Sequence, residues 1–109
     1  MKDEYNSKLS SIKEDNLNSL GEIQNIISRA GVLKVFHILL IMDQGVRYTD
    51  LQNKTNISFG ALYPNLVKLD KLRYINKIKR YNITFYKLTS KGLKLALRLN
   101  KLMWKWLNH

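Results

Sequence analysis

The sequence has no cysteine, one proline and only two histidines among its 109 residues. The absence of cysteine excludes disulfide scaffolds, thiolate zinc sites and cysteine nucleophiles. Two histidines make a histidine-built metal site improbable, and we interpret His37, which lies in a strongly apolar segment, as a packed core residue. The longest apolar stretch, residues 32–42, is too short to span a membrane, and no hydrophobic signal segment opens the chain. We therefore expect a soluble cytoplasmic protein that binds no metal or other cofactor and no membrane.

Residue patterns that support catalysis are also missing. Asp43, Asp50 and Asp70 stand apart from one another, and no glycine-rich phosphate loop is present. Neither a serine–histidine–acid arrangement nor a zinc-ligand spacing can be traced. These absences predict that the protein is not an enzyme.

Positive charge, in contrast, is abundant and unevenly distributed. The formal net charge is +11 and the sequence pI is about 10.0. Residues 1–30 carry a net charge of −1, whereas residues 31–109 carry +12. Such an imbalance favours polyanionic partners, either nucleic acid or an anionic membrane surface. The last three quarters of the chain therefore hold the surface expected to meet a polyanion.

The apolar pattern predicts one domain, because a mass of 12.8 kDa with 45% apolar residues is enough for a single core. Residues 9–30 place apolar side chains three or four apart, which is typical of a helix. We expect further helices over residues 32–43, 49–55, 59–71 and 89–107, and a β-hairpin formed by residues 73–80 and 83–88. The helices at 49–55 and 59–71, joined by a short turn with an apolar Ile57, form a helix-turn-helix pattern.

The helix over residues 59–71 carries the most informative surface. One side collects large apolar residues expected to face the core, namely Phe59, Leu62, Tyr63, Leu66 and Leu69. The other side is small, amidic and cationic, and with the capping residue it comprises Ser58, Gly60, Ala61, Pro64, Asn65, Lys68 and Lys71. Small residues allow close approach to DNA, Asn can pair with adenine, and Lys can contact phosphate or guanine. The alternative is an ordinary solvated helix face.

Basic and aromatic residues alternate in the predicted hairpin. Lys77 and Lys79 share one face of the first strand, and Arg80 and Tyr81 occupy the tip. A cationic tip with an adjacent aromatic residue suits contact with the DNA backbone or minor groove. Lysines on an edge strand also prevent edge-to-edge pairing, and the two roles can coexist.

The last helix has a wider apolar surface than one small core needs. Its cations are spaced three or four apart from Lys91 to Lys105 and form one stripe. The excess apolar surface predicts a two-fold dimer formed through Leu95, Leu99, Leu102, Met103 and Trp106. A basic helix that carries Trp104 and Trp106 could instead lie on a membrane surface.

Two stretches of the sequence resemble the PadR-type transcriptional regulators. Residues 60–70, GALYPNLVKLD, are similar to their recognition-helix pattern, and Tyr74-Ile75 with residues 85–92, FYKLTSKG, is similar to the wing and its exit. The usual glycine before the Tyr74-Ile75 pair is Arg73 here. The MarR and HxlR groups share the layout more loosely. The resemblance covers about residues 32–95 and implies a dimeric regulator that places its fourth helix in the major groove.

These observations together predict a mainly α fold with a small β-hairpin wing, that is, a winged helix-turn-helix with extra N- and C-terminal dimerisation helices. Its expected parts are an N-terminal helical segment (1–30), the DNA-binding domain (31–90) and a C-terminal dimerisation helix (91–109). The predicted function is sequence-specific recognition of double-stranded DNA by a homodimeric transcriptional regulator. The alternatives are an architectural protein that binds DNA without sequence preference, and a membrane-surface or protein-interaction module.

Overall fold

The computed structural model describes residues 14–29 and 31–107, with side chains described for residues 20–29 and 31–102. Along this part of the chain the elements are helices α2 (Glu14–Ile27) and α3 (Val32–Ile41), strand β1 (Val46–Arg47), helices α4 (Tyr48–Thr55) and α5 (Phe59–Lys71), strands β2 (Ile75–Arg80) and β3 (Ile83–Leu88), and helix α6 (Ser90–Leu107). The mainly helical fold with a β wing is the one that the sequence predicts. Residues 9–13 of the predicted first helix lie outside the described residues.

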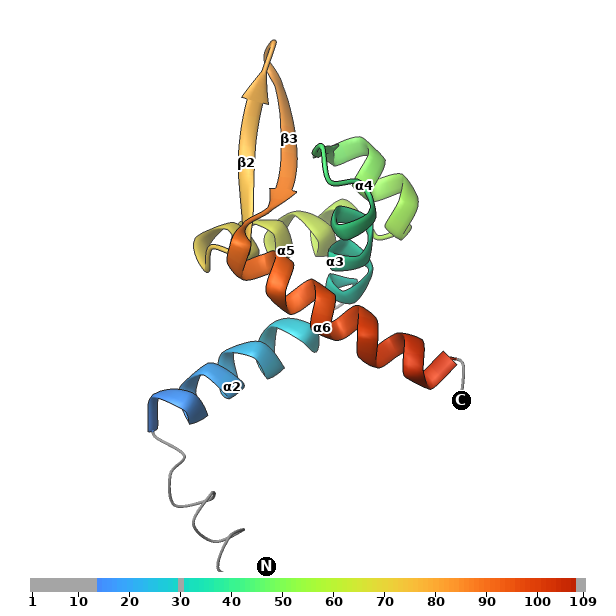
Figure 1. Cartoon of the computed structure of the whole chain (residues 1–109). Helices are drawn as coiled ribbons and strands as arrows, with labels where there is room; N and C mark the ends of the chain where they lie inside the picture. Colours follow the sequence, from blue (N-terminus) through green and yellow to red (C-terminus); the bar gives the residue numbers. More distant parts are fainter. Residues whose placement is uncertain (1–13, 30, 108–109) are drawn as a thin grey trace, which may run out of the picture.

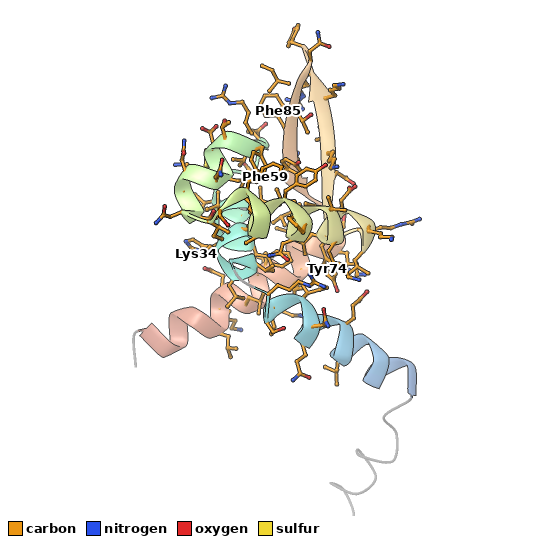
Figure 2. The ribbon with its side chains drawn as sticks, turned by 180° about the vertical axis from the view of Figure 1, so that it is seen from behind. Lys34, Phe59, Tyr74 and Phe85 are labelled. Carbon is orange, nitrogen blue, oxygen red and sulfur yellow. The ribbon has the colours of Figure 1, made fainter. Side chains whose placement is uncertain are left out.

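Helix α3 is the centre of the packing. Val35, Phe36 and Leu39 are buried and belong to the same core as Leu62 and Leu66 of α5. Helix α6 crosses the near side of α3 in Figure 1, and the reverse view shows α5 in front, so that these two helices cover opposite sides (Figure 2). The hairpin of β2 and β3 extends away from this helical body (Figure 1).

Helix α3 is buried on one side only, although its sequence is strongly apolar. Leu33, His37 and Ile41 are four residues apart and all exposed, Ile41 to 65%. They form a stripe on one side of the helix, because residues at this spacing share a face. His37 is therefore a surface histidine, not a packed core residue.

The wing forms a three-stranded antiparallel sheet in the order β1-β3-β2. The hairpin follows the prediction, with Ile75 opposite Leu88 and Arg80 opposite Ile83. Tyr81 and Asn82 connect the strands with φ values of 52° and 64°, which suit a two-residue turn between right-twisted strands. The short strand β1 is an addition to the prediction, which contained no strand before residue 73; residues 46–47 pair with β3.

Helix α5 continues through Pro64 and ends in a regular C-terminal motif. The loss of one backbone donor at Pro64 is tolerated, so the continuous helix of the prediction is confirmed. At the end of α5 the Arg73 N–H donates to the Asp70 carbonyl and the Tyr74 N–H donates to the Leu69 carbonyl. This pair of bonds is a Schellman motif, and it requires Arg73 to adopt a left-handed φ of 66°.

The first turn of α6 packs closely against the backbone of Tyr74, which follows α5. The Gly92 N–H donates to the Thr89 hydroxyl, and the Thr89 N–H donates to the Tyr74 carbonyl at 3.0 Å. A Cβ at Gly92 would lie 1.9 Å from that same carbonyl oxygen. Position 92 therefore needs glycine because the backbone of the neighbouring segment approaches so closely.

Candidate nucleic-acid interface

The exposed face of α5 is formed by residues spaced three or four apart. Gly60, Tyr63, Pro64, Val67 and Lys71 are all exposed along this face. Phe59 extends the face at the helix start and is 58% exposed. It lies on the side of α5 that faces the hairpin (Figure 2). The face is open to a partner along the length of the helix, and Ser58 precedes it in an exposed position.

The wing places its cations beside this face. Lys77, Lys79 and Arg80 are exposed, and Tyr81 at the tip is 98% exposed. The Lys77 ammonium lies 6.0 Å from the centre of the Tyr63 ring, which joins the wing to α5 at the edge of cation–π range. Among the residues that the structure describes, none of the three wing cations forms an ion pair, so their charge is available to a polyanion.

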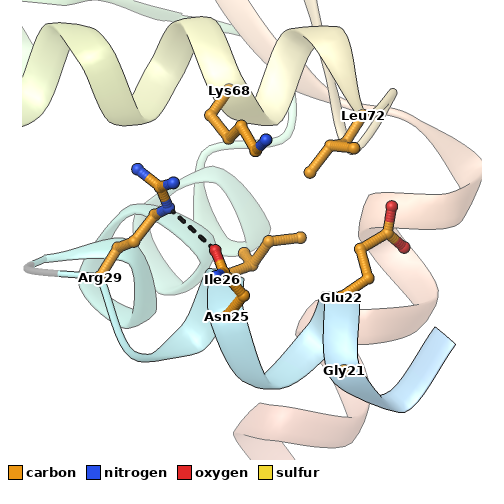
Figure 3. A pocket seen from close by; sticks show the side chains of 7 residues that line it. All are labelled: Gly21, Glu22, Asn25, Ile26, Arg29, Lys68 and Leu72. Atoms are coloured by element: carbon orange, nitrogen blue, oxygen red, sulfur yellow. Dashed lines mark hydrogen bonds between the residues drawn. The ribbon is translucent and has the colours of Figure 1, made fainter. Parts of the chain in front are cut away.

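Two residues predicted for the DNA-facing side of α5 point elsewhere. Asn65 is buried, with only 7% of its surface exposed, and accepts a hydrogen bond from Arg29 at 3.3 Å. Its position three residues after Leu62 and four before Leu69 puts it on the core side of the helix, so the outward placement of Asn65 is wrong. Lys68 is half-buried and directs its ammonium group toward α2, over a pocket that Glu22 also lines (Figure 3).

An aromatic cluster takes the place of the expected polar surface. The Phe59 and Tyr63 rings are stacked, with centroids 5.2 Å apart and an interplanar angle of 8°. Tyr48 meets both rings edge-on, at 5.7 Å from Phe59 and 6.4 Å from Tyr63. The prediction that Phe59 and Tyr63 face the core is wrong. Tyr63 shares a face of the helix with Val67, four residues later, and both are exposed. The rings instead form part of the exposed surface.

Helix α2 is attached to the domain through Glu22. The Tyr74 hydroxyl donates to the Glu22 carboxylate at 3.0 Å, and the Lys91 ammonium lies 3.6 Å from the same carboxylate. Lys91 also donates to the Leu72 carbonyl and stands over the Tyr74 ring. Burial, the hydrogen bond to Glu22 and the negative charge of Glu22 raise the pKa of Tyr74 to about 12. Lys91, the first residue of the predicted cationic stripe, is thus engaged within the fold.

The apolar surface of α6 is divided between two sides. Leu95 and Leu99, predicted for a dimer interface, are partly buried and pack against the domain's own core. Leu93, Leu97 and Leu102 are 44%, 51% and 59% exposed. Met103 and Trp106, also predicted for that interface, have side chains outside the described set. Of the leucines predicted for the interface, Leu102 is therefore exposed, whereas Leu95 and Leu99 are taken up by the domain's own core.

Residues 14–29 and 31–107 hold neither a cluster of metal-ligating side chains nor a single membrane-spanning helix. Within these ranges no three His, Asp or Glu side chains gather as a metal site would require. No single helix in these ranges is both long enough and apolar enough to span a membrane. Leu20–Ile27 of α2 and Val32–Ile41 of α3 have the required length and apolar character only when taken together, and this pair is bent by 93°.

A family model described as a winged helix DNA-binding domain matches residues 32–107. The chain belongs to this family. Similar solved structures of winged helix type include HlyU from Vibrio cholerae, which is 22% identical with a TM-score of 0.69, over 83% of this chain and 97% of HlyU. The antimony-specific transcriptional repressor AntR is 16% identical with a TM-score of 0.72, over 90% of this chain and 87% of AntR. Streptococcus pneumoniae FabT, solved in complex with DNA, is 19% identical with a TM-score of 0.52, over 98% of this chain and 81% of FabT. No curated protein matches the chain.

The family match assigns the elements of the chain to the parts of a winged helix domain, because residues 32–107 include every element from α3 to α6. The solved structures share the fold with this chain, and at identities of 16% to 22% they show no more than the fold. In this domain α4 and α5 form the helix-turn-helix and β2 and β3 form the wing. The exposed face of α5 and the cationic wing are therefore the candidate nucleic-acid interface.

Proposed function

We propose that this winged helix domain is a transcriptional regulator that recognises specific sequences in double-stranded DNA as a homodimer. Helix α5 enters the major groove, and Lys77, Lys79, Arg80 and Tyr81 of the wing contact the backbone. The observation that carries this proposal is the open face of α5 beside three exposed wing cations, which form no ion pair with any described residue. The close match of residues 60–70 to the PadR-type recognition helix supports assignment to that group.

The proposed contacts of α5 follow from exposure. Gly60, Pro64 and the half-buried Ala61 let the helix approach the duplex closely, and the exposed Ser58 and Lys71 lie at the two ends of the same helix. Ser58 and Lys71 suit contacts to phosphate, because a hydroxyl and an ammonium group both donate hydrogen bonds. Asn65 and Lys68 are not part of this proposal, since both are directed toward α2.

The dimer is proposed from the apolar residues that α6 leaves exposed. Leu93 and Leu97 share one face of the helix, and Leu102 lies on the opposite face. A two-fold pairing would cover an exposed apolar face in both subunits at once. The C-terminal half of α6 extends beyond the domain, where a second subunit can reach it (Figure 1). A two-fold dimer would present two α5 helices about 34 Å apart, which corresponds to one turn of DNA.

The experiment is a selection of preferred duplexes from a random pool with the full chain, followed by competition binding against scrambled duplexes. A specific regulator should bind the selected duplex at least about 10³-fold more tightly than scrambled ones. If the dimer neutralises about eight phosphates, log K falls with log salt at a slope of about −7. An affinity that does not respond to salt, or no binding to duplexes, contradicts the proposal.

The second candidate is an architectural protein that binds duplexes regardless of sequence. This candidate is favoured by the scarcity of hydrogen-bonding side chains on the exposed face of α5. The net charge of +11 is also consistent with it. Nearly equal affinities for selected and scrambled duplexes in the same competition would establish this candidate and contradict the first.

A further inference from the structure

The middle of the proposed DNA-facing surface is apolar. Phe59, Tyr63 and Val67 are 58%, 40% and 39% exposed on α5. The amide of Asn65, which could have paired with adenine, accepts a hydrogen bond from Arg29 instead. Lys68, which could have paired with guanine, lies over the pocket beside α2 (Figure 3). The side chains best suited to read bases through paired hydrogen bonds are therefore withdrawn from this surface.

The aromatic part of this surface is held in place. The stacked rings of Phe59 and Tyr63 rest against Tyr48 at the start of α4, which meets both edge-on. Edge contacts of this kind favour a defined ring orientation. Phe59 and Val67 thus offer apolar contact area at two positions two helical turns apart, without needing to reorganise.

The charge around the apolar surface indicates what covers it. Lys77 lies 6.0 Å from the Tyr63 ring, and Lys71 is exposed on the same face of α5. Lys79 and Arg80 continue the positive charge along the wing. An apolar strip bordered by cations complements a DNA groove, where phosphates flank the base edges.

We propose that α5 recognises thymine through apolar contact of Phe59 and Val67 with the 5-methyl group in the major groove. Thymine is the one base that presents a methyl group there, and apolar side chains are its natural contacts. This inference rests on the proposed function, because it needs α5 in the major groove. It assigns the specificity of the site to methyl recognition in place of hydrogen-bonded readout.

The test replaces single thymines with deoxyuridine in the selected duplex. Deoxyuridine pairs like thymine and differs only by the missing methyl group, so an effect on affinity measures that group alone. Loss of one buried methyl corresponds to about 0.8 kcal/mol, so binding should weaken about fourfold at one or two positions in each half-site. Deoxyuridine elsewhere in the duplex should leave the affinity unchanged.

Variants of the protein identify the contacting side chain. For each variant the measured quantity is the ratio of the dissociation constants for the deoxyuridine and thymine duplexes. Phe59→Ala or Val67→Ala should bring this ratio from about four toward one at a given position. Tyr63→Phe should keep the ratio, because it removes only a hydroxyl. Leu33→Ala is the control, since Leu33 is 38% exposed, close to the 39% of Val67, but lines a pocket against α6.

The outcomes separate this inference from the proposed function. If the selected duplex stays strongly preferred but no deoxyuridine substitution weakens binding, methyl recognition is wrong and the regulator remains. Methyl recognition is also wrong if neither alanine variant lowers the ratio of dissociation constants. It is wrong as well if Phe59→Ala and Val67→Ala leave the affinity for the selected duplex unchanged and abolish the binding of a protein instead. If no duplex is preferred over scrambled DNA, the proposed function and this inference are both wrong.

Discussion

The two sides of this winged helix domain use their charged side chains differently. Where α2 meets the rest of the domain, several charges are engaged within the fold: Glu22 contacts Tyr74 and Lys91, and Arg29 donates to Asn65. On the side of α5 and the wing, Lys79 and Arg80 form no ion pair with any described residue. The same residue types thus stabilise the fold in one region and, in the proposed function, contact DNA in the other. Composition alone does not separate the two roles.

The largest effect is expected at the junction that holds the α6 side together. Gly92→Ala would place a methyl group against the Tyr74 carbonyl oxygen, so that backbone must shift. We expect a loss of about 3 kcal/mol or more of unfolding free energy, measured by chemical denaturation. Gly21→Ala is the control, because a Cβ at position 21 meets nothing within 4 Å. Equal stability of the two variants would contradict the close approach at position 92.

A pH titration probes the Tyr74–Glu22 contact. The ordinary tyrosine pKa of 10.0 is raised to about 12 in the folded chain. Between these values the unfolded chain has lost the Tyr74 proton while the folded chain retains it, so stability falls as the pH rises. The contribution is complete below pH 10 and about 2 to 3 kcal/mol is lost by pH 12. The difference in unfolding free energy between the wild type and Tyr74→Phe isolates this effect, and a constant difference would contradict it.

The exposed side is tested by removing two cations at a time. Lys79→Ala with Arg80→Ala should make the salt slope of DNA binding shallower by about 1.8, because about two phosphate contacts are lost. Affinity should fall about tenfold for selected and scrambled duplexes alike. The matched control is Lys94→Ala with Arg98→Ala, which removes the same charge from α6. Equal changes in slope for the two pairs would mean that net charge, and not the wing, determines binding.

Asn65→Ala should affect folding and leave base preference intact. Loss of the amide leaves the Arg29 guanidinium without this acceptor, which is expected to lower the unfolding free energy by about 1 to 2 kcal/mol. Asn53→Ala, at an exposed amide on α4, serves as the control for stability. A variant of normal stability that has lost its preferred duplex would restore Asn65 as a base-reading residue.

The smallest effect is expected at the end of α5. Arg73→Gly should raise the unfolding free energy by about 0.5 to 1 kcal/mol, because glycine adopts the left-handed φ of 66° without strain. Arg73→Ala keeps the strain and should bring no gain. Thermal unfolding can distinguish the two, and equal melting temperatures would argue against strain at this position.

Much of the fold could be predicted from the sequence, because local signals agreed with one another. Apolar spacing predicted the helices, β-branched and aromatic runs predicted the hairpin, and the resemblance of residues 60–70 predicted a helix that contains Pro64. Strand β1 could not be predicted in the same way, since two residues give no periodicity and the pairing depends on β3.

The site was predicted less well, because polarity was taken as a guide to exposure. The amide of Asn65 suggested an outer position, whereas its spacing from Leu62 and Leu69 places it inside, where Arg29 of the α2 segment reaches it. Phe59 and Tyr63 were expected in the core because they are large and apolar. Phe59, however, is the first residue of α5, where the core no longer covers the helix. Both errors concern which side of α5 faces the core. That orientation about the helix axis is determined by packing against segments that are distant in the sequence.

The most direct test of the proposed interface is site-specific disulfide trapping on DNA. The chain contains no native cysteine, so a single introduced thiol reports one position only. Val67→Cys on α5 and His37→Cys at an exposed position of α3 are each incubated with the selected duplex carrying a thiol-tethered base in the major groove. We predict efficient cross-linking at position 67 and background cross-linking at position 37. Trapping at position 37 with none at position 67 would contradict the placement of α5 in the groove.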